Sequence, residues 1–176
     1  MKTFSAAFLG ALAFTAFDVS AQDAPPTDAQ IAAIVVTANQ VDIDAGHLAK
    51  SMSKNKEVKE FAQLMITDHT GVNKSATDLV HKLKVTPQES PTSESLKHGG
   101  DQNIAQLKEL KGAEFDRAYV DHEVAYHQSV LDALDQTLIP NAKNEELKSL
   151  MVKVRPAFVA HLEHAKHLQA SLAKKT

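Results

Sequence analysis

The chain has no cysteine among its 176 residues. This absence excludes disulfide bonds, a cysteine nucleophile and a lipid anchor attached to cysteine. It also removes thiolates from the possible ligands of a metal ion. A domain of this length therefore depends on the packing of its apolar side chains for stability.

A strong bias of charge and the usual catalytic motifs are missing too. Lys and Arg number 19 and Asp and Glu 22, which gives a formal net charge of −3 with the two signs interspersed. No basic patch is present for nucleic acid or anionic lipid, so we expect no nucleic-acid partner. The sequence contains no glycine-rich phosphate loop and no nucleophile elbow. Enzymatic activity therefore has no positive signature beyond a possible metal site.

Long apolar runs are confined to the N-terminus. The first 21 residues, "MKTFSAAFLGALAFTAFDVSA", combine an early Lys2, a short apolar run and a small-x-small ending at Val19-Ser20-Ala21. This pattern predicts a signal peptide (residues 1–21) that is cleaved near Ala21, followed by a mobile leader (residues 22–26). No later stretch approaches the roughly 20 apolar residues of a membrane helix. We therefore expect a periplasmic or secreted protein without stable membrane insertion.

Strand patterns are scarce, whereas helical spacing of apolar residues is common. The spacing predicts helices over residues 28–52, 56–84, 113–138 and 143–173, with a capping box between Thr27 and Gln30. The short turn after residue 52 makes the first two helices an antiparallel hairpin. Residues 86–100, rich in Pro, Ser and Gly, are expected to form a loop, and residues 101–112 a short helix ended by Gly112. Residues 27–174 are thus predicted to be one all-α domain, a four-helix bundle with a long second connection.

Several acids and histidines fall on the apolar faces of these helices. At about 100° per residue, they lie inside the apolar arc of their helix, whereas Asp44 lies near an arc boundary. Counting residues from the two turns places them at similar heights in the middle of the bundle. We therefore predict that one residue of the first helix, one of the second, two of the third and one of the fourth converge: Asp42, His69, Glu123, His127 and His161.

Imidazoles and carboxylates from facing helices are the usual ligands for Zn, Cu, Fe or Ni in a bundle core. Burying an unpaired carboxylate costs several kcal/mol, so a cation or an imidazolium is needed beside it. A purely structural network, completed by water and by Tyr119 or Asn73, is the alternative. A carboxylate-bridged di-iron centre is disfavoured, because Glu123 and His127 are four residues apart and the second and fourth helices offer no inward acid. We assign Asp116 to capping or to a Tyr or Arg contact.

The chain resembles the exported bacterial proteins of the family named domain of unknown function 4142, which have a ferritin-like helical bundle. The resemblance covers about residues 27–172 and rests on "VDIDAGHLAKS", "VKEFAQLMITDHT", "LKGAEFDRAYVDHEVAYHQ" and "VRPAFVAHLEHAKHL". It implies export and a ferritin-like fold, but it implies no activity. Helix one departs from the family pattern, because Asp42 and Asp44 stand where Glu is usual.

Three hypotheses of function follow from the residues. The first is a periplasmic bundle that binds a transition metal through His69, His127 and His161, supported by Glu123 and Asp42, for metal handling or sensing. The second is a non-enzymatic envelope or stress protein that acts through protein contacts, with structural histidines. The third is pH sensing by buried imidazoles. The sequence identifies no protein partner.

Overall fold

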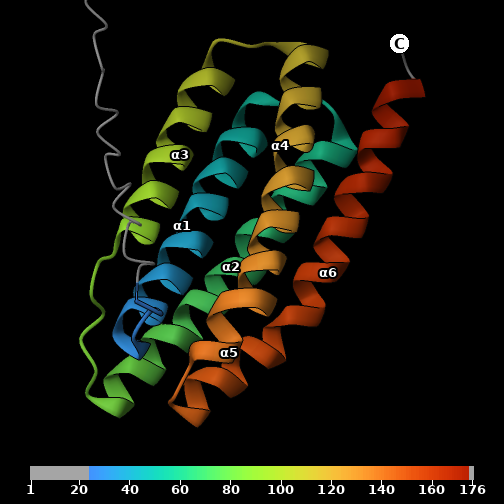
Figure 1. Ribbon diagram of the computed structural model, residues 1–176. Coiled ribbons are helices and arrows are strands. Elements are labelled where there is room, and N and C mark those ends of the chain that lie inside the picture. Colours follow the sequence, from blue (N-terminus) through green and yellow to red (C-terminus); the bar gives the residue numbers. More distant parts are fainter. Residues whose placement is uncertain (1–23, 175–176) are drawn as a thin grey trace, which may run out of the picture.

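The computed structural model describes residues 24–174, and all regular secondary structure in that range is helical (Figure 1). Its long helices are α1 (Asp28–Met52), α2 (Lys56–Leu83), α3 (Pro91–Lys108), α4 (Gly112–Ala133) and α6 (Glu145–Lys174). A π-helical turn, η1 (Leu134–Leu138), and the short α5 (Ile139–Asn141) join α4 to α6. Residues 24–174 contain no strand. The predicted signal peptide lies outside the described residues.

The ends of the first two helices follow from their capping residues. Thr27 and Gln30 form the predicted capping box at the start of α1, and this helix has the bounds that the sequence predicts. Asn55 caps α2 by accepting hydrogen bonds from the backbone N–H groups of Glu57 and Val58. Only residues 53–55 separate the two helices, so α1 and α2 form the expected antiparallel hairpin.

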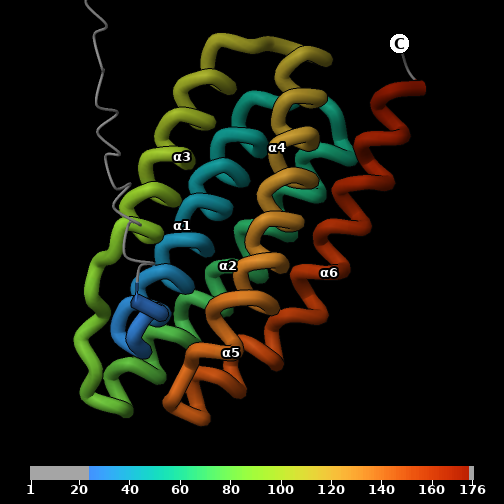
Figure 2. Tube along the Cα trace, in the orientation of Figure 1, coloured from blue at the N-terminus to red at the C-terminus, as the bar shows by residue number. Residues whose placement is uncertain are grey.

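Four of the helices surround a common interior. Contacts join α1 to α2, α2 to α6, α6 to α4 and α4 to α1, so that the four form a closed ring. Figures 1 and 2 show that α1 and α6 run in one direction and α2 and α4 in the other. Each helix of the ring is therefore antiparallel to both of the helices that it contacts in the ring. The connection from α2 to α4 crosses the length of the molecule and contains α3, which packs against the outer side of α1.

The prediction of a loop over residues 86–100 is wrong for most of that stretch, and the predicted short helix ended by Gly112 is wrong in its bounds. Helix α3 begins at Pro91 and ends at Lys108. Ser90 caps it through a reciprocal pair of hydrogen bonds with Ser93, and Pro91 occupies the first turn. Gly112, with a φ of +56°, instead begins α4. The helix predicted to stop at Leu138 also continues, through η1 and α5, to Asn141.

The apolar core is divided into two clusters. The first includes Phe61, Met65, Phe115 and Tyr119, and the second includes Ile31, Leu131, Met151 and Phe158, among other residues. The inward acids and histidines lie between these clusters along the ring helices. The molecule thus holds a polar layer between two apolar layers.

No helix within residues 24–174 combines the length and the apolar character that crossing a membrane requires.

Candidate metal centre

The structure brings together all five residues that the sequence predicts to converge. Asp42 comes from α1, His69 from α2, Glu123 and His127 from α4, and His161 from α6. Each is at most 3 % exposed. Asp44, the other acid considered in α1, is exposed and accepts a hydrogen bond from Gln40. Asp42 is therefore the acid of α1 that faces the cluster.

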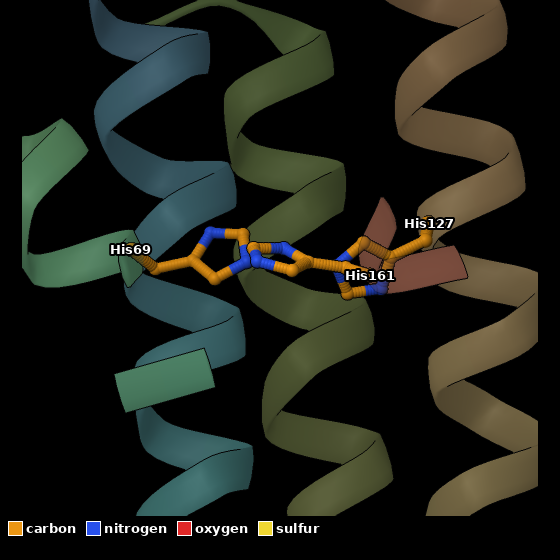
Figure 3. A group of neighbouring side chains, drawn as sticks. All are labelled: His69, His127 and His161. Atoms are coloured by element: carbon orange, nitrogen blue, oxygen red, sulfur yellow. The ribbon is translucent and has the colours of Figure 1, made fainter. Parts of the chain in front are cut away.

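The three imidazoles form a nearly regular triangle. Their ring centroids are 5.6 Å apart for His69 and His127, 5.3 Å for His69 and His161, and 5.5 Å for His127 and His161. Figure 3 shows the three side chains pointing toward one another from α2, α4 and α6. One ring nitrogen from each lies within 4.8 Å of the others. Ligand atoms of one ion lie about 3–3.5 Å apart when each bond is about 2.1 Å, so modest side-chain shifts would let one ion bind all three.

Two carboxyl groups adjoin this triangle on the side of α1 and α4. One oxygen of Asp42, one of Glu123 and one nitrogen of His127 also lie within 4.8 Å of one another. Asp42 Oδ2 is 3.1 Å from His69 Nε2 and 3.4 Å from His127 Nε2. Glu123 Oε2 is 3.5 Å from His127 Nδ1. His127 thus belongs to both groups and joins the acids to the histidines.

Each imidazole uses one ring nitrogen for a hydrogen bond directed away from the centre. His69 Nδ1 lies 2.7 Å from Asn39 Oδ1, and the amide nitrogen of Asn39 donates to Val35 O at 2.7 Å. Because that donation fixes the orientation of the amide, His69 Nδ1 must carry the proton. His127 Nδ1 similarly donates to the backbone oxygen of Glu123 at 3.0 Å. These bonds leave Nε2 of His69 and of His127 as unprotonated acceptors.

His161 is oriented in the same manner by the opposite nitrogen. Its Nε2 lies 2.9 Å from Asp68 Oδ2, a half-buried carboxylate at the neighbouring position to His69 in α2. Its Nδ1 is buried and has no hydrogen-bond partner. A carboxylate or carbonyl that holds one ring nitrogen while the other is free is the arrangement found behind metal-bound histidines.

The inner atoms of the cluster are buried without a hydrogen-bond partner. Asp42 Oδ2 faces two imidazole lone pairs, and neither approach has hydrogen-bond geometry. The cluster's unpartnered buried atoms are His69 Nε2, His127 Nε2, His161 Nδ1, Glu123 Oε2 and both oxygens of Asp42. A set of acceptors turned toward one another is stable only when a proton or a cation lies among them.

Burial controls the protonation of these groups. It raises the pKa of Asp42 from 3.8 to about 7, against a smaller lowering by the neighbouring carboxyl group of Glu123. Burial, followed by the charge of Asp42, raises the pKa of Glu123 well above its ordinary value. Burial and the neighbouring imidazoles lower the pKa of His69 to about 2. At neutral pH the imidazoles of the metal-free cluster are therefore neutral, and burial favours the protonated form of both carboxyl groups.

The pKa values of the other two imidazoles are also lowered. Burial and the charge of His161 lower the pKa of His127 to about 4. Burial lowers the pKa of His161, although Asp68 opposes this shift. Neutral imidazole is the form that binds a metal ion, so none of the three requires deprotonation at neutral pH.

A small cavity of about 10 Å³ lies beside Asp42, His69 and His127. This volume is close to that needed for one water molecule and is far too small for an organic substrate. The Phe158 ring, stacked on His69 with centroids 5.1 Å apart, and Tyr126 form its apolar walls. The centre therefore has room for one small species.

Sequence reasoning missed the residues that orient the histidines. Asn39 lies three positions before Asp42, so its place on the same face of α1 was a usable signal. Asp68 gave no such signal, because its partner His161 lies on another helix, 93 positions along the chain. Asp116 is buried and accepts a hydrogen bond of 2.6 Å from Ser53 Oγ, in the turn between α1 and α2. It takes no part in the centre.

Fold and site together define an all-helical protein with a buried histidine and carboxylate cluster that could hold a metal ion. The chain belongs to the family described as Domain of unknown function (DUF4142), which it matches over residues 15–168. This confirms the family predicted from the sequence motifs. No curated protein and no solved structure is detectably similar to the chain.

Proposed function

We propose that this protein is an exported metal-binding protein that holds one transition-metal ion among His69, His127, His161, Asp42 and Glu123. The observation that carries the proposal is the set of buried acceptor atoms turned toward one another, while partners outside the cluster fix each imidazole. A divalent cation bound by the three imidazoles would take up their lone pairs and offset the charge of the two carboxyl groups that adjoin His127. A single proton on Asp42 would satisfy only part of these acceptors.

The donor set restricts the metal. Three imidazoles and two carboxyl groups suit Zn, Cu, Fe or Ni, whereas Mg and Ca prefer ligands that are all oxygen. When bound, such an ion would supply Lewis acidity or, if it is Cu or Fe, redox chemistry. Asn39, Asp68 and the backbone of α4 orient the ligands, and Phe158 limits the access of water. We infer that the role is metal handling or sensing.

Metal content of protein purified without an affinity tag tests the proposal. We expect near-stoichiometric Zn, Cu, Fe or Ni by elemental analysis, or stoichiometric uptake of added Co²⁺ with a visible absorption band. The double variant His69→Ala, His161→Ala should lose this binding. The matched control, His81→Ala, His167→Ala, removes two exposed histidines from the same two helices and should retain it. Circular dichroism verifies that both variants remain helical.

A different outcome would favour the second hypothesis. Wild-type protein that contains no metal, and whose melting temperature does not rise with added Zn or Cu, would contradict metal binding. The histidines would then be structural elements of a protein that acts through contacts with other proteins. Equal metal loss in both double variants would show that binding is superficial, through exposed imidazoles.

We also propose that the chain is exported and that α1, α2, α4 and α6 form a ferritin-like four-helix bundle. Residues 1–21 support export by their signal-peptide pattern. The single long crossover from α2 to α4, together with ligands from every helix of the ring, supports the ferritin-like arrangement. Cell fractionation and N-terminal sequencing test export, with a mature N-terminus at Gln22 expected. A crystal structure with α1 and α4 parallel would contradict the bundle.

A further inference from the structure

A large cleft lies next to the cluster, on the side of the molecule where α3 begins. Its walls come from the first half of α1, the start of α3, the end of α4 and η1, and its volume is about 890 Å³. Ile34, Leu96, Val130 and Leu138 provide much of its apolar lining. Pockets of about 300–1,000 Å³ with mostly apolar walls are typical of sites for small organic ligands.

The lining of the cleft has no charged side chain among the described residues. Its polar groups are neutral amides and hydroxyls, such as those of Gln30, Ser129, Thr137 and Asn141. In the whole chain, 23% of the residues are charged. A surface hollow of this size without charge is therefore matched to a neutral occupant, because a charged ligand would lose its hydration without gaining an opposite charge.

A neighbouring hollow extends this lining toward α4. It has a volume of about 510 Å³, shares Pro91, Thr92 and Leu96 with the cleft, and adds His122 and Tyr126. His122 Nδ1 is buried and has no hydrogen-bond partner, and its ring stacks on Tyr126 with centroids 5.6 Å apart. A ligand that extends along the groove would therefore meet these two rings at this end.

We propose that this groove binds a neutral, largely apolar small molecule that carries a hydroxyl or carbonyl group. Ala38 and Val130 line both the cleft and the 10 Å³ cavity beside Asp42, His69 and His127. Tyr126 also lines the small cavity and donates a hydrogen bond of 2.9 Å to Ala38 O. One layer of side chains therefore separates the bound molecule from the cluster. Binding in the groove does not require a metal ion in the cluster.

A protein partner fits this groove less well than a small molecule. Protein interfaces of standard size bury roughly 800 Å² on each partner and have an apolar centre. The exposed large apolar side chains within the described residues are Leu64 on α2 and Val152 and Val159 on α6. None of them lines the groove, so no apolar rim continues from it. Residues 24–26 of the chain form part of its wall.

Titration of metal-free protein with Nile red tests this proposal, because the dye is neutral, apolar and carries a carbonyl group. We expect saturable binding of one dye per chain, with blue-shifted emission. Ala133→Trp places an indole in the cleft and should weaken binding at least about tenfold. Ser129→Trp, at an exposed position on the same wall, should act similarly and is easier for the fold to accept. Ala125→Trp, on an exposed part of α4 outside the groove, should leave the affinity unchanged.

Three outcomes would overturn the inference. The first is the absence of saturable binding to the wild-type protein, and the second is equal weakening by Ala125→Trp. The third is a dimer in sedimentation velocity that Ala133→Trp converts to a monomer, because the cleft would then be an interface between two copies. Uptake of Co²⁺ by the same variants is measured separately. Failure of dye binding would thus not contradict metal binding, and failure of metal binding would not contradict dye binding.

Discussion

At the scale of single residues, each imidazole of the cluster gives its N–H to a group outside the centre and keeps a lone pair inside. The acceptors of these hydrogen bonds are Asn39, Asp68 and the backbone oxygen of Glu123. In a core built only for stability, the polar groups would pair with one another and leave few acceptors orphaned. Here each imidazole has a hydrogen-bond partner on the side away from the centre and none on the side that faces it. This asymmetry supports the proposed ligand set over a buried hydrogen-bond network.

Replacement of Asn39 by Ala tests the role of this outer hydrogen bond. The change removes the acceptor of His69 Nδ1–H and leaves that donor buried. We expect stability in urea to fall by about 1–3 kcal/mol. We also expect metal affinity to fall about 10- to 100-fold, because the ring loses its fixed orientation and tautomer. Competition with a chromophoric chelator measures the affinity.

Asn103→Ala is the matched control for Asn39→Ala. Asn103 is also a buried amide, but it lies on α3, which contributes no residue to the cluster. Its replacement should leave the metal affinity within about twofold of the wild type, whatever its effect on stability. Equal losses of affinity in the two variants would mean that Asn39 acts only through general stability.

At the scale of elements, α3 shows why composition alone is a poor guide to structure. Pro, Ser and Gly are typical of loops, but Ser at the N-cap and Pro in the first turn are equally typical of a helix start. Two adjacent glycines are also typical of a turn. One of them, Gly100, is needed because a Cβ at this position would lie 2.7 Å from Val41 Cγ2 of α1. Close packing on α1, which sequence spacing does not reveal, therefore determines this helix.

The two glycines of α3 give opposite predictions for substitution by Ala. A Cβ at Gly99 would meet no atom within 4 Å, so Gly99→Ala should stabilise the protein by about 0.5–1 kcal/mol through helix propensity. Gly100→Ala should destabilise it by about 1–3 kcal/mol, because the buried Val41 must move. Urea unfolding measures both. Val41→Ala should reduce the effect of Gly100→Ala, and equal effects of the two glycine substitutions would contradict the close packing.

Helix faces were predictable from the sequence, whereas pairings between helices were not. The bounds of α1 and the inward direction of Asp42, His69 and His161 follow from apolar spacing, a local property. The contact between Asp68 and His161 depends on how α2 and α6 are rotated against each other. The direction of α4 relative to α1 likewise depends on the length and path of a connection that contains α3. These are tertiary features that no single helix encodes.

At the scale of the whole molecule, the buried cluster makes the stability of the metal-free fold depend on pH. The pKa values of His69, His127 and His161 are lowered on folding, so their contribution is lost as the pH falls below 6.5, where only the unfolded chain takes up protons. The pKa values of Asp42 and Glu123 are raised, so their contribution is lost as the pH rises from about 4 through 7.

These opposing effects predict a stability maximum at about pH 6–6.5 in the presence of EDTA. Stability should fall by about 1 kcal/mol per pH unit on either side, since roughly one net proton is exchanged. Urea unfolding at pH 5, 6.2 and 8 measures the profile. Glu123→Gln, which removes one carboxyl group, should flatten the decline above pH 6.5. A profile that is flat from pH 5 to 8 would show that these groups do not titrate as buried groups.

Metal binding should tie the four helices of the ring together, because each supplies at least one ligand and α3 supplies none. An ion at about 100 times its Kd adds about 2.7 kcal/mol, which corresponds to a rise of about 5–10 °C in Tm. Hydrogen exchange should slow around residues 42, 69, 127 and 161, and less along α3. The double variant His69→Ala, His161→Ala should show neither effect. Protection confined to one helix would instead indicate a surface site, because only an ion bound in the interior contacts all four helices at once.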